Sequence, residues 1–322
     1  MKNRHSEFDV SNSVQVTNTQ SVSNAVCDIY HSCFPASDNS LLKRAFQDFD
    51  SLFEGYYKGY NACDTYYHDK QHTLDMTLAL MRILQGYMSE TNQRYTEREA
   101  VLAVITALFH DSGYIRKLHD HKHENGAEYT RIHVSRSAGF LRNYLILIGM
   151  GEFAEISANM VHYTGYEVAP ENIILPDERY HLLGQMVGTA DLIAQMADRC
   201  YLEKCRDRLY PEFVLGGLTE IHNENGEMIK VYASPEDLLR KTPGFFETEI
   251  SYRLNTLFQG LHNHVVSHFD GQNLYMDSIK RNIEHIKRVN QQNQFQGLRR
   301  DPPKLSQNNL SASELIKAQH KA

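Results

Sequence analysis

The chain has 322 residues, of which 41% are hydrophobic and 23% charged, a composition typical of a folded globular protein. A formal net charge of −7 argues against a nucleic-acid-binding surface, and no apolar run approaches the ~18 residues that a membrane span needs. The N-terminus has no basic start followed by an apolar core, and the five cysteines are expected to be reduced thiols, so we expect a cytoplasmic protein.

Hydrophobic periodicity predicts an all-α protein with polar ends. Residues 1–22 are rich in Ser, Asn, Thr and Gln without a sustained period, which predicts a disordered arm, and residues 291–322 are expected to form a polar, flexible tail. Between them, one helical domain is expected over 23–290, with its core at about 60–200 and C-terminal helices over 235–290. The predicted helices are 22–33, 41–57, 68–88, 97–110, 126–149, 152–162, 177–210, 235–239, 245–268 and 273–289.

Two local signals refine this pattern. Residues 219–232 contain Asn225-Gly226 between apolar residues, which predicts a small β-hairpin insertion in the helical chain. Ser234 followed by Pro235 and two acidic residues is typical of a helix N-terminus, with a capping serine and a proline at the first helical position.

The first chemically informative segment covers residues 67–76. His68, His72 and Asp75 are spaced four and three residues apart, so a helix would place two imidazoles and a carboxylate on one face. One imidazole can bind a metal ion while the other, one turn away, serves as a proton donor. The carboxylate of Asp75 can accept the second N–H of the ligating histidine and fix its tautomer.

The second segment is residues 108–113, where the pair His110-Asp111 ends an apolar helix. Thr96-x-x-Glu99 fits a capping box and marks where that helix begins. A buried helix that delivers an imidazole and a carboxylate at its last turn needs compensation for their desolvation. Imidazole nitrogen and carboxylate oxygen are good ligands for a divalent first-row ion, which predicts a metal site.

Three further regions carry candidate ligands. His119, His121 and His123 alternate in a predicted loop, and His123, the nearest to the following helix, is the preferred ligand of the three. His162 ends a short helix, where a histidine can also simply complement the helix dipole. Asp191 lies in a helix that is apolar nearly all round, so its carboxylate needs a cation or an ion pair.

His72, His110-Asp111 and Asp191, in this order and with long helical gaps, resemble the H…HD…D signature of the HD-domain superfamily of metal-dependent phosphohydrolases. The resemblance covers about residues 60–200. Residues 67–76 resemble the Tyr-His-Asn-x-x-His-x-x-Asp-Val segment of cyclic nucleotide phosphodiesterases, in which the first His donates a proton and the second binds metal. His123 and His162 resemble the two extra histidines with which bacterial HD phosphodiesterases hold a second metal.

The sequence departs from the family pattern at three points. Asp69 replaces the Asn of the cyclic nucleotide enzymes, and Tyr114 and Ile115 stand where a Lys is frequent after His-Asp-x-Gly. Counterparts of the purine-clamping Gln and Phe are not evident. These departures make the assignment to diesterases weaker than the assignment of a metal site.

The resemblance implies an HD-domain helical bundle that holds one or two divalent ions, drawn from Mn, Fe, Zn or Mg. One ion would be held by His72, His110, Asp111 and Asp191, and Asp111 would bridge to a second ion on His123 and His162. His68 and Asp111 are the implied catalytic residues. The sequence does not choose a phosphate-neutralising residue among Arg116, Lys117, Arg131 and Arg136.

The expected activity is hydrolysis of a phosphodiester, foremost a cyclic or other nucleotide, by a metal-activated hydroxide. Three alternatives stay open: a nucleotide phosphomonoesterase, an HD-type di-iron oxygenase, and a non-catalytic HD module that binds a nucleotide. The expected partner is a small-molecule phosphoester, and a homodimer is also possible. The aromatic residues after 235 could line the pocket, form a dimer face or belong to the core: Phe245, Phe246, Tyr252 and Phe258.

Overall fold

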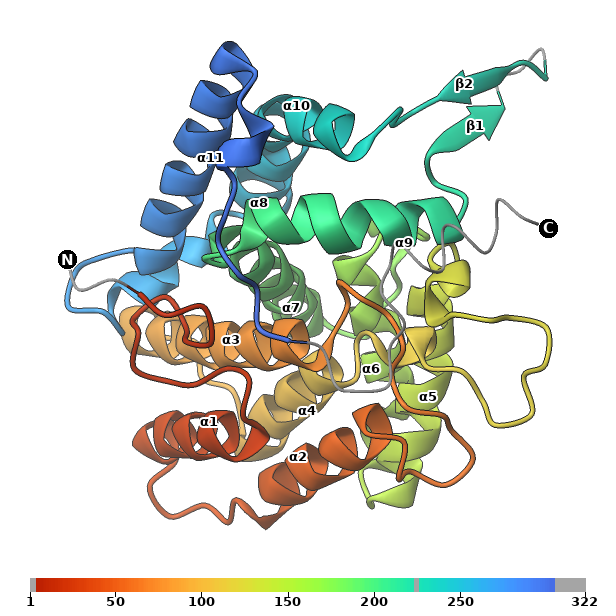
Figure 1. Ribbon diagram of the computed structural model, residues 1–322. Helices are drawn as coiled ribbons and strands as arrows, with labels where there is room; N and C mark the ends of the chain where they lie inside the picture. The colour runs from red at the N-terminus through yellow and green to blue at the C-terminus, as the bar shows by residue number, and fades with distance from the viewer. Residues whose placement is uncertain (1–3, 223–225, 305–322) are drawn as a thin grey trace.

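Figure 1 shows a computed structural model of the chain, in which residues 4–222 and 226–304 are described. The prediction of an all-α bundle is confirmed, since the described residues form helices and one two-stranded sheet. The α-helices are α1 (Thr19–Cys33), α2 (Ser40–Phe53), α3 (Lys70–Glu90), α4 (Glu97–Leu108), α5 (His133–Leu147), α6 (Ala154–Met160), α7 (Glu178–Ala197), α8 (Tyr201–Lys204), α9 (Tyr210–Leu215), α10 (Pro235–Phe245) and α11 (Leu274–Gln292).

Helices α3 and α7 form the centre of the bundle. Helix α3 packs against α1, α4 and α7, and α7 packs in addition against α11, so both are covered on several sides (Figure 1). Nearly every residue of α3 from Gln71 to Met88 is buried, and α7 is buried from Leu183 to Ala194. A helix that is apolar nearly all round belongs in the interior of a large domain, and the polar side chains it carries there must find partners.

Side-chain caps fix where several of these helices begin. Thr96 and Glu99 form the capping box predicted for α4, and Ser234 caps α10 by accepting a hydrogen bond from the Asp237 N–H at 3.2 Å. Asp69 caps α3 by accepting from the His72 N–H at 2.9 Å. The cap of α3 therefore sets the backbone position of His72.

The predicted single helix over 177–210 is instead broken after Ala197. The Asp198 side chain accepts a hydrogen bond from the Cys200 N–H at 2.6 Å and forms an ion pair with Lys204 at 2.7 Å. Aspartate competes with helical hydrogen bonding in this way, which favours a turn. Beyond the turn the chain continues through α8, a π-helical turn η6 (Cys205–Leu209) and α9.

The predicted β-hairpin is present. Strands β1 (Glu220–His222) and β2 (Met228–Lys230) pair antiparallel, with Ile221 opposite Ile229. Gly226 has φ +79°, the left-handed conformation that glycine provides in hairpin turns, while Asn225 lies outside the described residues. Figure 1 shows the hairpin projecting from the helical body beside α10.

The N-terminal segment differs from the expected disordered arm. Asp9 is fully buried, and its carboxylate accepts hydrogen bonds from the backbone of Ser13 and Val14 and from Arg82 Nη2 at 2.7 Å. Arg82 in α3 also donates to the Tyr275 hydroxyl at 2.8 Å. A buried ion pair with a partner 73 residues away thus anchors a segment whose own composition is too polar to fold independently.

Replacing Arg82 with leucine should lower the free energy of unfolding by roughly 3–5 kcal/mol, because it leaves the Asp9 carboxylate buried without its cation. The matched control is Arg98→Leu, since Arg98 pairs with Glu152 at the surface, where both side chains are 54% exposed. That control should change the stability by less than about 1 kcal/mol. Urea unfolding of both variants measures the difference, and equal effects would contradict a structural role for the buried pair.

The C-terminal tail was expected to be flexible from residue 291, but residues 291–304 pack on the domain. Phe295 and Leu298 are buried, and the Arg300 backbone N–H donates to Glu203 Oε1 at 3.1 Å. Two apolar side chains among the polar residues are sufficient to hold this segment. The rest of the predicted tail, 305–322, lies outside the described residues.

The five cysteines are all free thiols in the described part of the chain. Across the same residues, the length and hydropathy needed to cross a bilayer do not occur together in any helix.

Candidate metal centre

Three helices bring four of the predicted ligands together. His72 comes from the first turn of α3, Asp191 from the middle of α7, and His110 and Asp111 from the end of α4. The ligand atoms of His72, His110 and Asp111 all lie within 4.8 Å of one another. Asp191 Oδ1 lies 3.1 Å from His72 Nε2 and 3.9 Å from His110 Nε2. We call these four residues the His/Asp cluster.

The hydrogen bonds of the cluster leave its ligand atoms facing one another. His110 Nδ1 donates to the Ala107 carbonyl oxygen at 2.8 Å, so Nε2 is the nitrogen that faces the carboxylates. His110 Nε2 lies 3.1 Å from Asp111 Oδ2, yet this buried oxygen has no well-oriented hydrogen-bond partner among the described residues. A buried carboxylate oxygen without a donor is a place where a cation compensates for the lost hydration.

The pKa shifts within the cluster also show that its carboxylates favour a nearby positive charge. Burial alone would lower the pKa of His110, but attraction to Asp111 and Asp191 raises it to about 9. Burial alone would raise the pKa of Asp111, but His110, His68 and His72 hold it well below its usual range. Metal ions compete with protons for such sites, and imidazole and carboxylate side chains are ligands that can hold a divalent ion.

His68 lies beside the cluster and is held by a residue that the sequence did not point to. Glu212, fully buried in α9, accepts a hydrogen bond from His68 Nδ1 at 2.6 Å and another from the Tyr67 backbone N–H at 2.6 Å. Burial alone would lower the pKa of His68, but Glu212, Asp111 and Asp191 raise it to about 9. The Glu212 carboxylate favours the protonated form of His68, and Nε2 is the nitrogen that Glu212 does not bind.

The structure places His133, and not the predicted ligand His123, beside the cluster. His133 Nε2 lies 3.9 Å from Asp111 Oδ1, and its Nδ1 donates to the Thr130 carbonyl at 2.7 Å. His123 instead donates to Asp120 at 3.0 Å and is not among the described residues that line the cavity. The start of α5 reaches the turn after the His-Asp pair because Gly113 has no side chain. A Cβ at Gly113 would lie 1.8 Å from the His133 carbonyl oxygen.

Several other predicted site residues lie away from the cluster. His162 lies outside the cavity lining, and its buried Nδ1 has no partner among the described residues. Arg116 forms hydrogen bonds with Asp64 and with the His123 carbonyl, and Lys117 is exposed, so neither faces the cavity. A role for either cation in binding phosphate stays a prediction.

Of Asp75 and the two remaining candidate arginines, only Arg131 lines the cavity. Asp75 is buried below His72, but in the described part of the chain no hydrogen bond joins the two, and burial raises the pKa of Asp75 to about 7. Arg136 donates to the carbonyl oxygens of Gly113 and Ile115. Arg131 is the one of the four candidate cations that lines the cavity.

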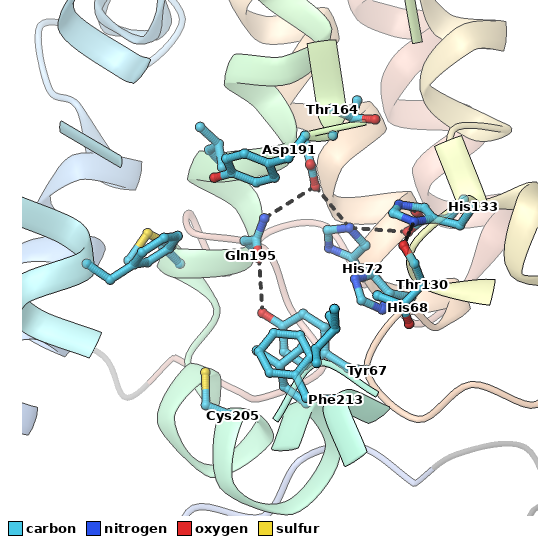
Figure 2. A pocket seen from close by; sticks show the side chains of 18 of the residues that line it. Tyr67, His68, His72, Thr130, His133, Thr164, Asp191, Gln195, Cys205 and Phe213 are labelled. Carbon is cyan, nitrogen blue, oxygen red and sulfur yellow. Dashed lines mark hydrogen bonds and ion pairs between the residues drawn. The ribbon is translucent and has the colours of Figure 1, made fainter. Parts of the chain in front are cut away.

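The cluster lies at one end of a cavity of about 490 Å³ (Figure 2). In Figure 2, Gln195 links Asp191 to the Tyr67 hydroxyl across this space, and His133 lies on the side of His68 and Thr130. Of the aromatic residues after 235, Phe245 lines the cavity, whereas Phe258 is buried in the core. Much of the remaining lining, which we call the apolar wall, is contributed by Tyr201, Phe213, Tyr232, Leu238, Phe245 and Ile250.

Comparison with known proteins gives a likeness of fold. No protein-family model matches the sequence, and no curated protein matches it. Among solved structures, the chain is similar to the phosphodiesterase domain of the RhoPDE fusion protein from the choanoflagellate Salpingoeca rosetta. The TM-score is 0.54 and the sequence identity 14%, over 91% of this chain and 97% of that domain. The fold of this chain is therefore similar to that of a phosphodiesterase domain along nearly its whole length.

Proposed function

We propose that this protein is a divalent-metal-dependent phosphodiesterase of the HD-domain type, acting on a nucleotide phosphodiester. The observation that carries the proposal is the position of His68, hydrogen-bonded to the buried Glu212 and beside the His/Asp cluster, at one end of a cavity. An imidazole acid next to a metal centre assists hydrolysis of a phosphodiester whose leaving group needs a proton. The phosphodiesterase-domain fold supports the same assignment.

In this proposal His72, His110, Asp111 and Asp191 hold one divalent ion, and Asp111 Oδ1 with His133 Nε2 offers ligands for a second. When bound, such ions neutralise charge on the phosphoryl oxygens and lower the pKa of water. His133 presents Nε2 because its Nδ1–H is engaged by the Thr130 carbonyl. It takes the place that the sequence assigned to His123 and His162.

The protein residues supply the proton and the orientation. Glu212 binds His68 Nδ1 and favours the imidazolium, so the Nε2 proton is available to the departing alkoxide oxygen. The apolar wall of the cavity accommodates an organic group attached to the phosphate and excludes water from that group. Arg131 is placed to attract a negatively charged substrate to the cavity.

The test is an assay of the protein loaded in turn with Mn, Zn, Fe and Mg against bis- and mono-p-nitrophenyl phosphate, then a panel of cyclic nucleotides. We expect metal-dependent hydrolysis of the diester that a chelator abolishes. A preference for the monoester would identify a phosphomonoesterase instead. Turnover that depends on iron and oxygen would identify an oxygenase, and binding of nucleotides without turnover would identify a non-catalytic module.

A further inference from the structure

Tyr114 contacts both imidazoles that lie beside the His/Asp cluster. Its ring stacks on His68 with the ring centroids 4.5 Å apart and on His133 with the centroids 4.3 Å apart, each at an interplanar angle of 19°. Tyr114 is only 2% exposed and lines the cavity with the two histidines. No role for Tyr114 was evident from the sequence.

The two stacking contacts restrict the tilt of the imidazole rings, which their hydrogen bonds alone do not restrict. His68 is bound through Nδ1 to Glu212, and His133 through Nδ1 to the Thr130 carbonyl. A single hydrogen bond fixes one ring atom, and the ring can still tilt about that bond. Contact with the face of an aromatic ring fixes the plane as well, so the two constraints together set the direction of each Nε2.

Tyr114 is itself held firmly to the metal ligand Asp111. Asp111 directly precedes the 3-10 turn η1 (Ser112–Tyr114), and Tyr114 ends it. The Tyr114 N–H donates to the Asp111 carbonyl oxygen at 3.1 Å and so closes this turn. Gly126 packs against the backbone of Tyr114, since a Cβ at Gly126 would lie 2.2 Å from the Tyr114 carbonyl oxygen. A single rigid turn therefore fixes Asp111 and the ring that orients both histidines.

We propose that Tyr114 is a positioning residue, whose ring orients the imidazoles of His68 and His133 relative to Asp111. The inference rests on the proposed function for its effect on rate, but the orientation itself does not depend on any substrate. A phenylalanine can provide the same ring face, whereas a leucine, which is apolar but smaller and without a ring, cannot. The two substitutions therefore separate stacking from simple filling of space.

The kinetic test compares Tyr114→Leu with Tyr114→Phe on two diesters with the same metal. With an alkyl leaving group, which needs a proton, Tyr114→Leu should lower kcat roughly 10- to 100-fold. With p-nitrophenolate, which leaves without a proton, the loss should be at least about 5-fold smaller, because it reports only the altered position of His133. Tyr114→Phe should restore most of the alkyl-ester rate. Equal losses on both diesters for Tyr114→Leu would overturn the role of Tyr114 in orienting His68, because only a misplaced proton donor makes the loss depend on the leaving group.

A second kinetic comparison tests whether Tyr114 acts through His68. On the alkyl ester, adding Tyr114→Leu to His68→Gln should lower kcat by less than about 2-fold beyond His68→Gln alone. Fully additive losses would contradict the inference. The control Tyr30→Leu removes another buried tyrosine ring, in α1, and should not change the ratio of the two diester rates.

An NMR measurement tests the stacking even if the protein hydrolyses none of these esters. With histidines labelled at Cε1, the His68 and His133 ring protons are assigned by replacing each histidine with glutamine. The ring current of Tyr114 should shift both signals, and Tyr114→Leu should abolish these shifts while Tyr114→Phe keeps them. Unchanged histidine signals in Tyr114→Leu would contradict the inference, and failure of the proposed function alone would leave them as expected.

Discussion

Replacing Asp111 with alanine should lower hydrolysis of bis-p-nitrophenyl phosphate by at least about 10³-fold, the largest effect we expect from one substitution. Asp111 is the only residue of the His/Asp cluster whose two oxygens face different imidazoles. Its Oδ2 lies 3.1 Å from His110 Nε2, and its Oδ1 lies 3.9 Å from His133 Nε2. Its loss would therefore weaken both proposed ion positions together.

The measurement combines initial rates with metal content determined by mass spectrometry after dialysis. The matched control is Asp120→Ala, because Asp120 also pairs with a histidine, His123, but lies outside the cavity. We expect Asp120→Ala to keep its metal and to remain within about 3-fold of the wild-type rate. An Asp111→Ala protein that retained both metal and turnover would show that the metal centre lies elsewhere.

Replacing His68 with alanine should affect the rate according to the leaving group. On an ester with an alkyl leaving group we expect a loss of about 10²–10⁴-fold in kcat, the range that general acid catalysis contributes. On a p-nitrophenyl ester the loss should be less than about 10-fold, because that leaving group is stable without a proton. Steady-state kinetics on the two substrates, with the metal content measured in parallel, gives the comparison.

Glu212→Gln provides the matched control for this prediction. Glutamine keeps the size of Glu212 and can still accept the hydrogen bond from His68, but it removes the charge that favours the imidazolium. It should therefore give a smaller loss than His68→Ala and the same dependence on the leaving group. A His68→Ala protein with the full rate on the alkyl ester would eliminate the acid role.

Much of the metal centre could be predicted because its residues carry local signals. His68 and His72 stand four residues apart, although the helix predicted from residue 68 begins only at Lys70, so that His68 precedes its cap. His110-Asp111 directly follows an apolar helix whose capping box is visible in the sequence. Asp191 stands out as a carboxylate in a helix without other charges nearby. In each case the anomaly is a polar group in an apolar segment, which indicates that something compensates for its burial.

The other site residues depend on contacts between distant segments. Glu212 is separated from His68 by 144 residues, and nothing around it distinguishes it from an ordinary surface glutamate. His123 was preferred over His119 and His121 because it lies nearest to the helix predicted from Gly126, whereas α5 begins at His133, a residue that the sequence did not single out. Gly113 permits the close contact of that helix start with the turn after the His-Asp pair. The buried pair of Asp9 and Arg82 escaped prediction for the same reason, since a polar segment gives no sign of its partner.

The central claim is that the His/Asp cluster binds a divalent cation, and anomalous X-ray diffraction from crystals grown with Mn²⁺ tests it most directly. We predict an anomalous peak within bonding distance of His72 Nε2, His110 Nε2 and the carboxylates of Asp111 and Asp191. A second peak between Asp111 and His133 would support the position proposed for another ion. A crystal containing Mn²⁺ with no peak at the cluster, or with ordered Mn²⁺ only elsewhere, would contradict the account.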